Sequence, residues 1–175
     1  MLKYVTSDVV FQEVPDEVTL AIDIANCPCH CKGCHSPFLW KDEGVELTED
    51  SLWELIMPYE GELTCIGFMG GDIAPTEVAH LAGFVHRRFN GTLKTAWYSG
   101  RQTLPPGVDT SVFDYIKLGP YIEEKGALKS ETTNQRLYRR NNVDGKWEDI
   151  TYRFWRKGLP GDDEVDLSQT TAFKD

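Results

Sequence analysis

Three cysteines in one short segment are the residues of this chain best suited to carry chemistry. Cys27, Cys31 and Cys34 follow the spacing C-x3-C-x2-C and fall within eight consecutive residues. Cysteine thiolates spaced in this way bind zinc or iron–sulfur clusters. A structural zinc ion or a fully ligated cubic cluster takes four protein ligands, so three thiolates leave one coordination position open. The spacing therefore indicates a metal centre that engages a substrate directly.

The same segment also contains residues that could close the site. Cys29, His30 or His35 would complete a zinc shell of four thiolates, or of three thiolates and one imidazole. That alternative describes a non-catalytic zinc-binding interaction module, whose acidic surface would meet a basic partner. In the open-site interpretation Cys29 is a thiol that is not a ligand. Cys65 lies in a strand pattern, where we expect a buried small hydrophobic residue.

The composition of the chain indicates how many domains it forms, in which compartment it works and which kinds of partner it lacks. The chain has 175 residues and 41% of them are hydrophobic, which is enough for one domain with a substantial core. Because four of the five cysteines lie in one segment, a disulfide framework is a poor explanation and a reducing compartment a better one. The formal net charge of −10 argues against a nucleic-acid partner. No charged-then-apolar leader opens the chain and no apolar run approaches about 18 residues, so we expect a cytoplasmic protein without a membrane partner.

Strand and helix patterns alternate along the chain, which is typical of a parallel sheet with crossover helices. One domain is expected over 1–158, followed by an acidic, flexible tail over 159–175. Beyond Asn134 the pattern changes, and Asp144-Gly145 indicates a hairpin over about 135–155. Strands are predicted at 17–25, 63–69, 93–98 and 113–118, and helices from Thr48, an N-cap candidate, to Met57 and from Pro75 to the stop at Asn90-Gly91.

Each predicted strand ends in a loop of glycine or polar residues. The first strand leads into the cysteine loop (residues 26–35), the second into Gly70-Gly71-Asp72, the third into Ser99-Gly100 and the fourth into the segment after Leu118. Ligands of parallel α/β sheets and barrels sit outside the carboxyl ends of the strands. The four loops are therefore expected to converge on one face and to form a site there.

Taken in order, these motifs resemble those of the radical S-adenosylmethionine enzymes. Within that superfamily the chain is most similar to the activating proteins of anaerobic ribonucleoside-triphosphate reductases, which carry a glycine before the third cysteine, as Gly33 does, and a tryptophan six residues beyond it, as Trp40 does. The segments 97–100, 119–123 and 133–136 resemble later motifs of that family. The resemblance covers residues 17–140, whereas 23–26 depart from the family pattern.

The resemblance implies a cofactor arrangement and a fold. Cys27, Cys31 and Cys34 would hold a [4Fe-4S] cluster, and S-adenosylmethionine would bind the open iron through its amino and carboxylate groups. The fold would be α/β, a partial (β/α) barrel with a C-terminal β-hairpin extension, because about 250 residues are typical of the full barrel. The residues implied in cofactor binding are Gly33, Cys34, His35, Gly70, Gly71, Asp72, Ser99 and Lys117.

The resemblance also implies an activity and partners. Reductive cleavage of S-adenosylmethionine would release a 5′-deoxyadenosyl radical, which would take hydrogen from a glycine of the large anaerobic ribonucleotide reductase subunit. A low-potential donor such as flavodoxin or ferredoxin would supply the electron. Activation of another glycyl-radical enzyme, or a small-molecule radical reaction, remains an alternative within the same chemistry. No catalytic side chain beyond the cluster and cofactor is implied.

Overall fold

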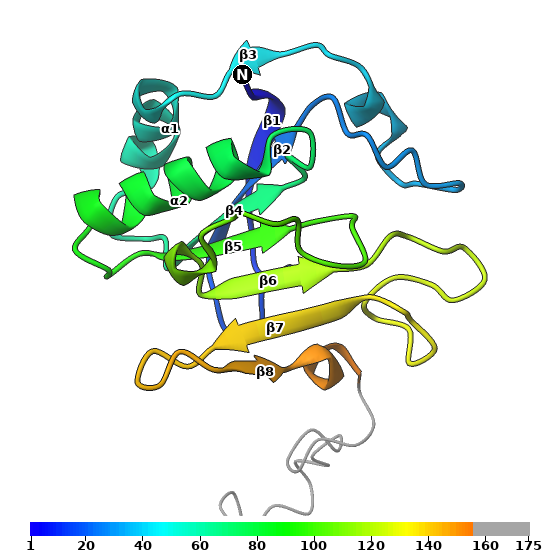
Figure 1. Cartoon of the computed structure of the whole chain (residues 1–175). Coiled ribbons are helices and arrows are strands. Elements are labelled where there is room, and N and C mark those ends of the chain that lie inside the picture. Colours follow the sequence, from blue (N-terminus) through cyan, green and yellow to red (C-terminus); the bar gives the residue numbers. More distant parts are fainter. Residues whose placement is uncertain (156–175) are drawn as a thin grey trace, which may run out of the picture.

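An open, mixed β-sheet organises residues 1–155, the part of the chain that the computed structural model describes (Figure 1). Its eight strands lie in the order β3-β1-β2-β4-β5-β6-β7-β8. Only the inner neighbours β2, β4, β5 and β6 run parallel, and the remaining pairs are antiparallel. The bounds are β1 (Lys3–Val10), β2 (Thr19–Ile24), β3 (Val45–Glu46), β4 (Cys65–Met69), β5 (Lys94–Tyr98), β6 (Tyr115–Leu118), β7 (Arg136–Arg140) and β8 (Trp147–Asp149).

Two α-helices cover one face of the sheet, and both were predicted. Helix α1 (Glu49–Ile56) begins after Thr48, whose side chain accepts a hydrogen bond from the backbone N–H of Ser51 at 3.2 Å. The hydroxyl of Ser51 in turn accepts the N–H of Thr48 at 2.8 Å, so each residue satisfies a free donor of the other. Helix α2 (Pro75–Arg88) begins at a proline, which needs no acceptor for its nitrogen. Single 3-10 turns are η1 (Pro37–Trp40), η2 (Met57–Tyr59), η3 (Thr110–Val112) and η4 (Thr151–Phe154).

The fold class is confirmed at the level of an α/β protein with a mixed sheet and few helices. The four predicted strands are present as β2, β4, β5 and β6, each shortened at its start. Strands β1 and β3 were not predicted, and η3 stands between β5 and β6 where a crossover helix would complete a βαβ unit. Within residues 1–155 the sheet does not close, because β3 and β8 are its two edges. The finer class, a partial barrel of the radical S-adenosylmethionine type, stays a prediction.

The predicted C-terminal hairpin exists with a shorter second arm. Strands β7 and β8 pair antiparallel around the turn that contains Asp144-Gly145, and they place the hairpin at one edge of the sheet. The second arm was predicted to reach 155 but ends at Asp149. The carboxylate of Asp149 accepts the N–H and the hydroxyl of Thr151, at 2.9 and 2.6 Å, and so turns the chain into η4. The predicted tail over 159–175 lies outside the described residues.

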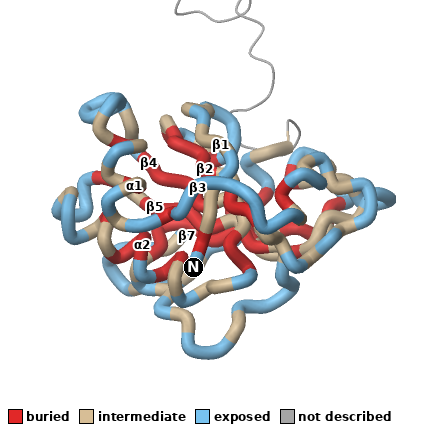
Figure 2. Tube along the Cα trace, turned by 90° about the horizontal axis from the view of Figure 1, so that it is seen from above, coloured by how far each residue is buried: buried red, intermediate tan, exposed pale blue. Residues whose placement is uncertain are grey.

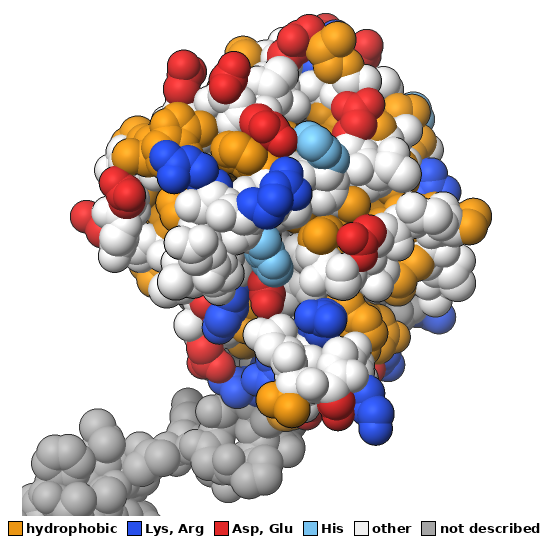
Figure 3. Space-filling view, turned by 60° about the vertical axis from the view of Figure 1, so that its left-hand side comes forward, with side chains coloured by type: hydrophobic (Ala, Val, Ile, Leu, Met, Phe, Trp, Pro, Cys, Tyr) orange, Lys and Arg blue, Asp and Glu red, His pale blue; other side chains and the backbone are white. Residues whose placement is uncertain are grey.

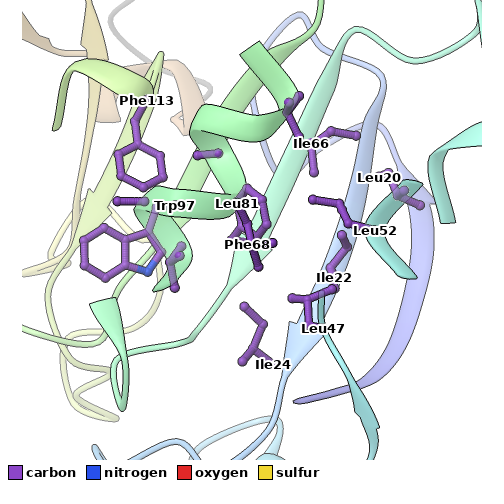
Figure 4. Close-up of a cluster of buried hydrophobic side chains, with 14 of the residues drawn as sticks. Leu20, Ile22, Ile24, Leu47, Leu52, Ile66, Phe68, Leu81, Trp97 and Phe113 are labelled. Carbon is purple, nitrogen blue, oxygen red and sulfur yellow. The ribbon is translucent and has the colours of Figure 1, made fainter. Parts of the chain in front are cut away.

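Hydrophobic residues form two buried clusters, one on each face of the sheet. Figure 2 shows buried residues along the strands and exposed ones in the outer loops. The larger cluster fills the space beneath α1 and α2, where Phe68 and Trp97 are fully buried (Figure 4). The smaller cluster, on the opposite face, joins Cys65 to Val14 of the 11–18 connection between β1 and β2. That connection therefore packs across the back of the sheet, and Cys65 is a buried small residue as predicted.

The helices and the charged surface of the described residues have two further features. No helix of residues 1–155 has the length and apolar character needed to span a membrane. On the face shown in Figure 3, acidic and basic side chains are interspersed rather than gathered into one basic patch. Such a face offers no continuous row of cations for a phosphate backbone.

Candidate functional site

One cavity of about 240 Å³ lies at the carboxyl ends of the parallel strands. The arrows of β4, β5 and β6 point toward the side on which the chain leaves β2 for the cysteine loop (Figure 1). The loops that follow these strands therefore meet around a single space. Its lining includes Cys27, Cys29, Cys31, Cys34, Trp40, Gly70, Asp72, Gly100, Lys117 and Tyr121.

The cysteine loop is closed at its base by backbone hydrogen bonds. The N–H groups of Asn26 and Cys27 donate to the carbonyls of Lys41 and Leu39, both at 2.9 Å. Inside the loop, Gly33 has a φ of +74°, and a Cβ there would stand 3.2 Å from the carboxyl carbon of Glu123. The loop after β6 thus packs against the cysteine loop. A glycine satisfies both the left-handed backbone and this close approach.

The Gly70-Gly71-Asp72 loop is held by its neighbours on the sheet. The N–H of Gly70 donates to the carbonyl of Tyr98 at 2.9 Å, and the indole N–H of Trp97 donates to the carbonyl of Gly70 at 2.8 Å. Gly71 has a φ of +87°, and a Cβ at this position would stand 2.5 Å from a methyl carbon of Val78. Gly71 is therefore required by the packing of the start of α2, whatever the cavity binds.

The carboxylate of Asp72 joins the loop after β4 to the loop after β5. It is fully buried, and its two oxygens accept hydrogen bonds from the hydroxyl of Ser99 at 2.5 Å and from the N–H of Gly100 at 2.8 Å. Arg101 donates to the backbone carbonyl of Asp72 at 2.8 Å, and the thiol of Cys29 lies 3.8 Å from the carboxylate. Both oxygens of Asp72 are thus already engaged by protein donors, so Asp72 and Ser99 position the two loops relative to each other.

Lys117 brings a buried ammonium group to the same cavity. Its Nζ donates to the carbonyls of Ser99 at 3.2 Å and Gly119 at 2.8 Å. Burial lowers the pKa of Lys117 to about 8, although the negative groups of Asp72 and the cysteine loop oppose this shift. A lysine ammonium has three donors, so one remains for an anionic ligand after these two bonds.

Cys29 differs from the other thiols of the loop in its surroundings. A Cβ added to Gly100 would stand 2.7 Å from its sulfur, so Cys29 is packed against the loop after β5. Burial and the neighbouring Asp72 carboxylate raise the pKa of Cys29 to about 12. Its thiol therefore lies between the loop after β5 and the carboxylate of Asp72.

Some of the residues expected in the site line the cavity, and others lie beside it. Cys27, Cys31, Cys34, Gly70, Asp72 and Lys117 line the cavity, whereas Gly33, His35, Gly71 and Ser99 stand next to it without lining it. His35 is exposed, with its ring centroid 5.1 Å from that of Tyr121. The sequence analysis missed Asp23, which lines the cavity, and Arg101, which donates to the backbone of Asp72. The alternation along β2 could have found Asp23, because it places Asp23 on the face opposite Ile22 and Ile24.

The residues around the cavity fit an iron–sulfur cluster in their chemistry. Within residues 1–155 no three or more His, Cys, Asp or Glu side chains are grouped closely enough to hold a metal ion. The loop thiols are nevertheless free of disulfides and share one cavity, and the N–H of Ser36 donates to the sulfur of Cys34 at 3.4 Å. Trp40 also lines the cavity, and its buried indole Nε1 has no acceptor among the described residues. Thiols and an unpaired N–H donor suit a cluster, whose sulfurs accept hydrogen bonds.

Comparison with known proteins found no match, whether to family models, to curated proteins or to solved structures.

Proposed function

We propose that this protein is an activating enzyme that uses a [4Fe-4S] cluster and S-adenosylmethionine to generate a glycyl radical on a separate anaerobic ribonucleotide reductase subunit. The observation that carries the proposal is the cavity in which three thiols with C-x3-C-x2-C spacing meet the glycine loop after β4 and the buried Lys117. A closed structural site would need a fourth ligand, whereas the thiol of Cys29 is packed against Gly100 and lies 3.8 Å from the carboxylate of Asp72.

Each part of the cavity has a role in this proposal. Cys27, Cys31 and Cys34 would ligate three irons, and the bound cluster would supply the electron that cleaves S-adenosylmethionine to methionine and a 5′-deoxyadenosyl radical. Gly70 lines the cavity, and its backbone would be the part of the glycine loop that the cofactor approaches. Lys117 would place its free donor toward the carboxylate of the cofactor. The open sheet would leave room for a protein substrate at the mouth of the cavity.

Arg101 and Ser99 contribute by holding Asp72 in place. The hydroxyl of Ser99 binds the carboxylate of Asp72, and the guanidinium of Arg101 binds its carbonyl, so the loop after β4 keeps one conformation. A preorganised loop lowers the entropy that binding would otherwise cost. The protein therefore supplies position and exclusion of water, while cluster and cofactor supply the chemistry.

The first test is anaerobic reconstitution of the full chain, followed by iron and sulfide analysis and electron paramagnetic resonance with and without S-adenosylmethionine. We expect about four irons and four sulfides per chain and a reduced spectrum that changes when the cofactor is added. Cys31→Ala should abolish that spectral change. Cys29→Ala is the matched control in the same loop and should retain it.

The second step tests the target of the radical chemistry. Incubation of the reconstituted protein with a purified large anaerobic reductase subunit, S-adenosylmethionine and reductant should give a glycyl-radical signal on the large subunit. A cluster that responds to S-adenosylmethionine but leaves the reductase without a radical would favour another glycyl-radical enzyme or a small-molecule substrate. Tight zinc binding with no cluster would instead support the interaction module.

A further inference from the structure

The indole of Trp40 is a buried donor whose hydrogen bond is missing from the protein itself. Its Nε1 is inaccessible to solvent and has no acceptor within residues 1–155. Two other indoles are satisfied: that of the fully buried Trp97 donates to the carbonyl of Gly70 at 2.8 Å, and that of the partly buried Trp155 donates to the carbonyl of Leu128 at 3.0 Å. An unpaired buried N–H costs about 1–3 kcal/mol, so a group of this kind usually has a partner.

The position of Trp40 is fixed relative to the cysteine loop. Trp40 is the last residue of η1, between Leu39 and Lys41, whose carbonyls accept the N–H groups that close the base of the loop. Its ring stacks on that of His30, with centroids 5.0 Å apart and planes 19° from parallel. Stacking on His30 and the backbone hydrogen bonds of Leu39 and Lys41 therefore hold Trp40 against the cysteine loop. Trp40 lines the same cavity as the thiols.

The acceptors that line the cavity bear on the missing partner of this indole, which can only donate. Oxygen acceptors are present at Asp23, Ser36, Asp72, Tyr121 and Gln135, but within residues 1–155 none of them accepts the indole N–H. Sulfur is the acceptor type that the cysteine loop concentrates, and the N–H of Ser36 already donates to the sulfur of Cys34 at 3.4 Å. A group bound by these cysteines would add sulfur acceptors to the cavity that Trp40 lines.

We propose that Trp40 is a positioning residue that donates its Nε1–H to a sulfur of the bound cluster and thereby raises the cluster's reduction potential. This inference rests on the proposed function, because it requires a cluster at Cys27, Cys31 and Cys34. A hydrogen bond to sulfur stabilises the reduced cluster more than the oxidised one, since reduction places more negative charge on the sulfurs. Loss of the bond therefore makes the cluster harder to reduce.

The experiment compares Trp40→Phe with the unaltered protein after anaerobic reconstitution. Phenylalanine keeps an aromatic ring against His30 and removes only the donor. Trp53→Phe is the matched control, since Trp53 stacks on Phe89 and does not line the cavity. Potentiometric titration followed by electron paramagnetic resonance should show about a tenfold shift of the reduction equilibrium in Trp40→Phe, to a potential about 59 mV more negative. The control should titrate as the unaltered protein does.

A second measurement does not depend on the variant assembling a cluster. In unaltered protein labelled with ¹⁵N-indole tryptophan, pulsed resonance of the reduced cluster should detect a ¹⁵N coupling and an exchangeable proton that disappears in D₂O. Absence of both signals from a cluster that responds to S-adenosylmethionine would overturn the inference and leave the proposed function standing, as would an unchanged potential in Trp40→Phe. Failure of the unaltered protein to assemble a cluster would overturn the proposed function itself.

Discussion

Gly71→Ala tests the packing that holds the loop after β4, and its cost can be worked from the structure. The ideal Cβ would stand 2.5 Å from a methyl of Val78 and 3.3 Å from the Cδ1 of Ile24, both side chains being fully buried. Overpacking of this kind costs about 1–3 kcal/mol. Val78 cannot turn away easily, because a β-branched side chain in a helix has one strongly preferred rotamer. The φ of +87° adds about 1–2 kcal/mol of backbone strain for any residue but glycine.

Gly61→Ala separates the two contributions. Gly61 has a φ of +83°, and a Cβ there meets nothing within 4 Å, so this variant carries the backbone strain without the clash. In urea unfolding followed by tryptophan fluorescence, Gly71→Ala should therefore lose about 1–3 kcal/mol more than Gly61→Ala. Adding Val78→Ala should remove much of that excess in a double-mutant cycle. Equal losses in Gly71→Ala and Gly61→Ala would refute the assigned contact.

Three further predictions concern the core and two buried ionisable groups. Phe68→Ala should lower the free energy of unfolding by about 3–5 kcal/mol, measured by urea titration, because Phe68 is fully buried beneath the helices. Burial acts to raise the pKa of Asp114, but hydrogen bonds from His86 and Thr95 outweigh burial, so the pKa is lowered. The carboxylate should therefore stabilise the protein, relative to Asp114→Asn, at pH values above the ordinary aspartate pKa. In unfolding titrations from pH 7 to pH 2, this contribution to the free energy of unfolding should decline as pH falls through the folded-state pKa. Burial lowers the pKa of Lys117 to about 8. The free energy of unfolding of the unaltered protein, relative to that of Lys117→Met, should therefore fall as pH decreases from about 10.4 toward 8 and stay level below pH 8. A difference in unfolding free energy that does not change with pH would contradict the burial argument.

The parts of the fold that were predictable from sequence are those with local causes. Thr48 and Pro75 predict where the two helices begin, because capping by a threonine and the fixed φ of a proline act within the first helical turn. Strand β1 was missed because Thr6, Ser7 and Asp8 interrupt its apolar alternation, and its register shifts between Tyr4 and Thr6. Its strand character comes from pairing with β2, which lies beyond a connection of several residues.

The candidate site was predictable to a similar degree and for a similar reason. The spacing of the cysteines and the glycines after β4 are visible in the chain, so the residues that form the cavity could be named. The hydrogen bond between Ser99 and Asp72 joins residues from two loops, and no local pattern indicates it. The unpaired indole of Trp40 is likewise visible only after folding, because its lack of an acceptor is a property of the assembled cavity.

The buried carboxylate of Glu17, on the 11–18 connection, has a consequence for the order in which the chain can fold. Its oxygens bind the hydroxyls of Thr64 and Tyr115 and the ammonium of Lys94, at sequence separations of 47, 98 and 77 residues. During synthesis the connection must therefore wait for Thr64, for Lys94 of β5 and for Tyr115 of β6 before its only buried charge has all these partners. Contacts of such long range are formed slowly, because loop-closure entropy is lost before they contribute. We expect the back of the sheet to be the last part of the protein to become protected from hydrogen exchange during refolding.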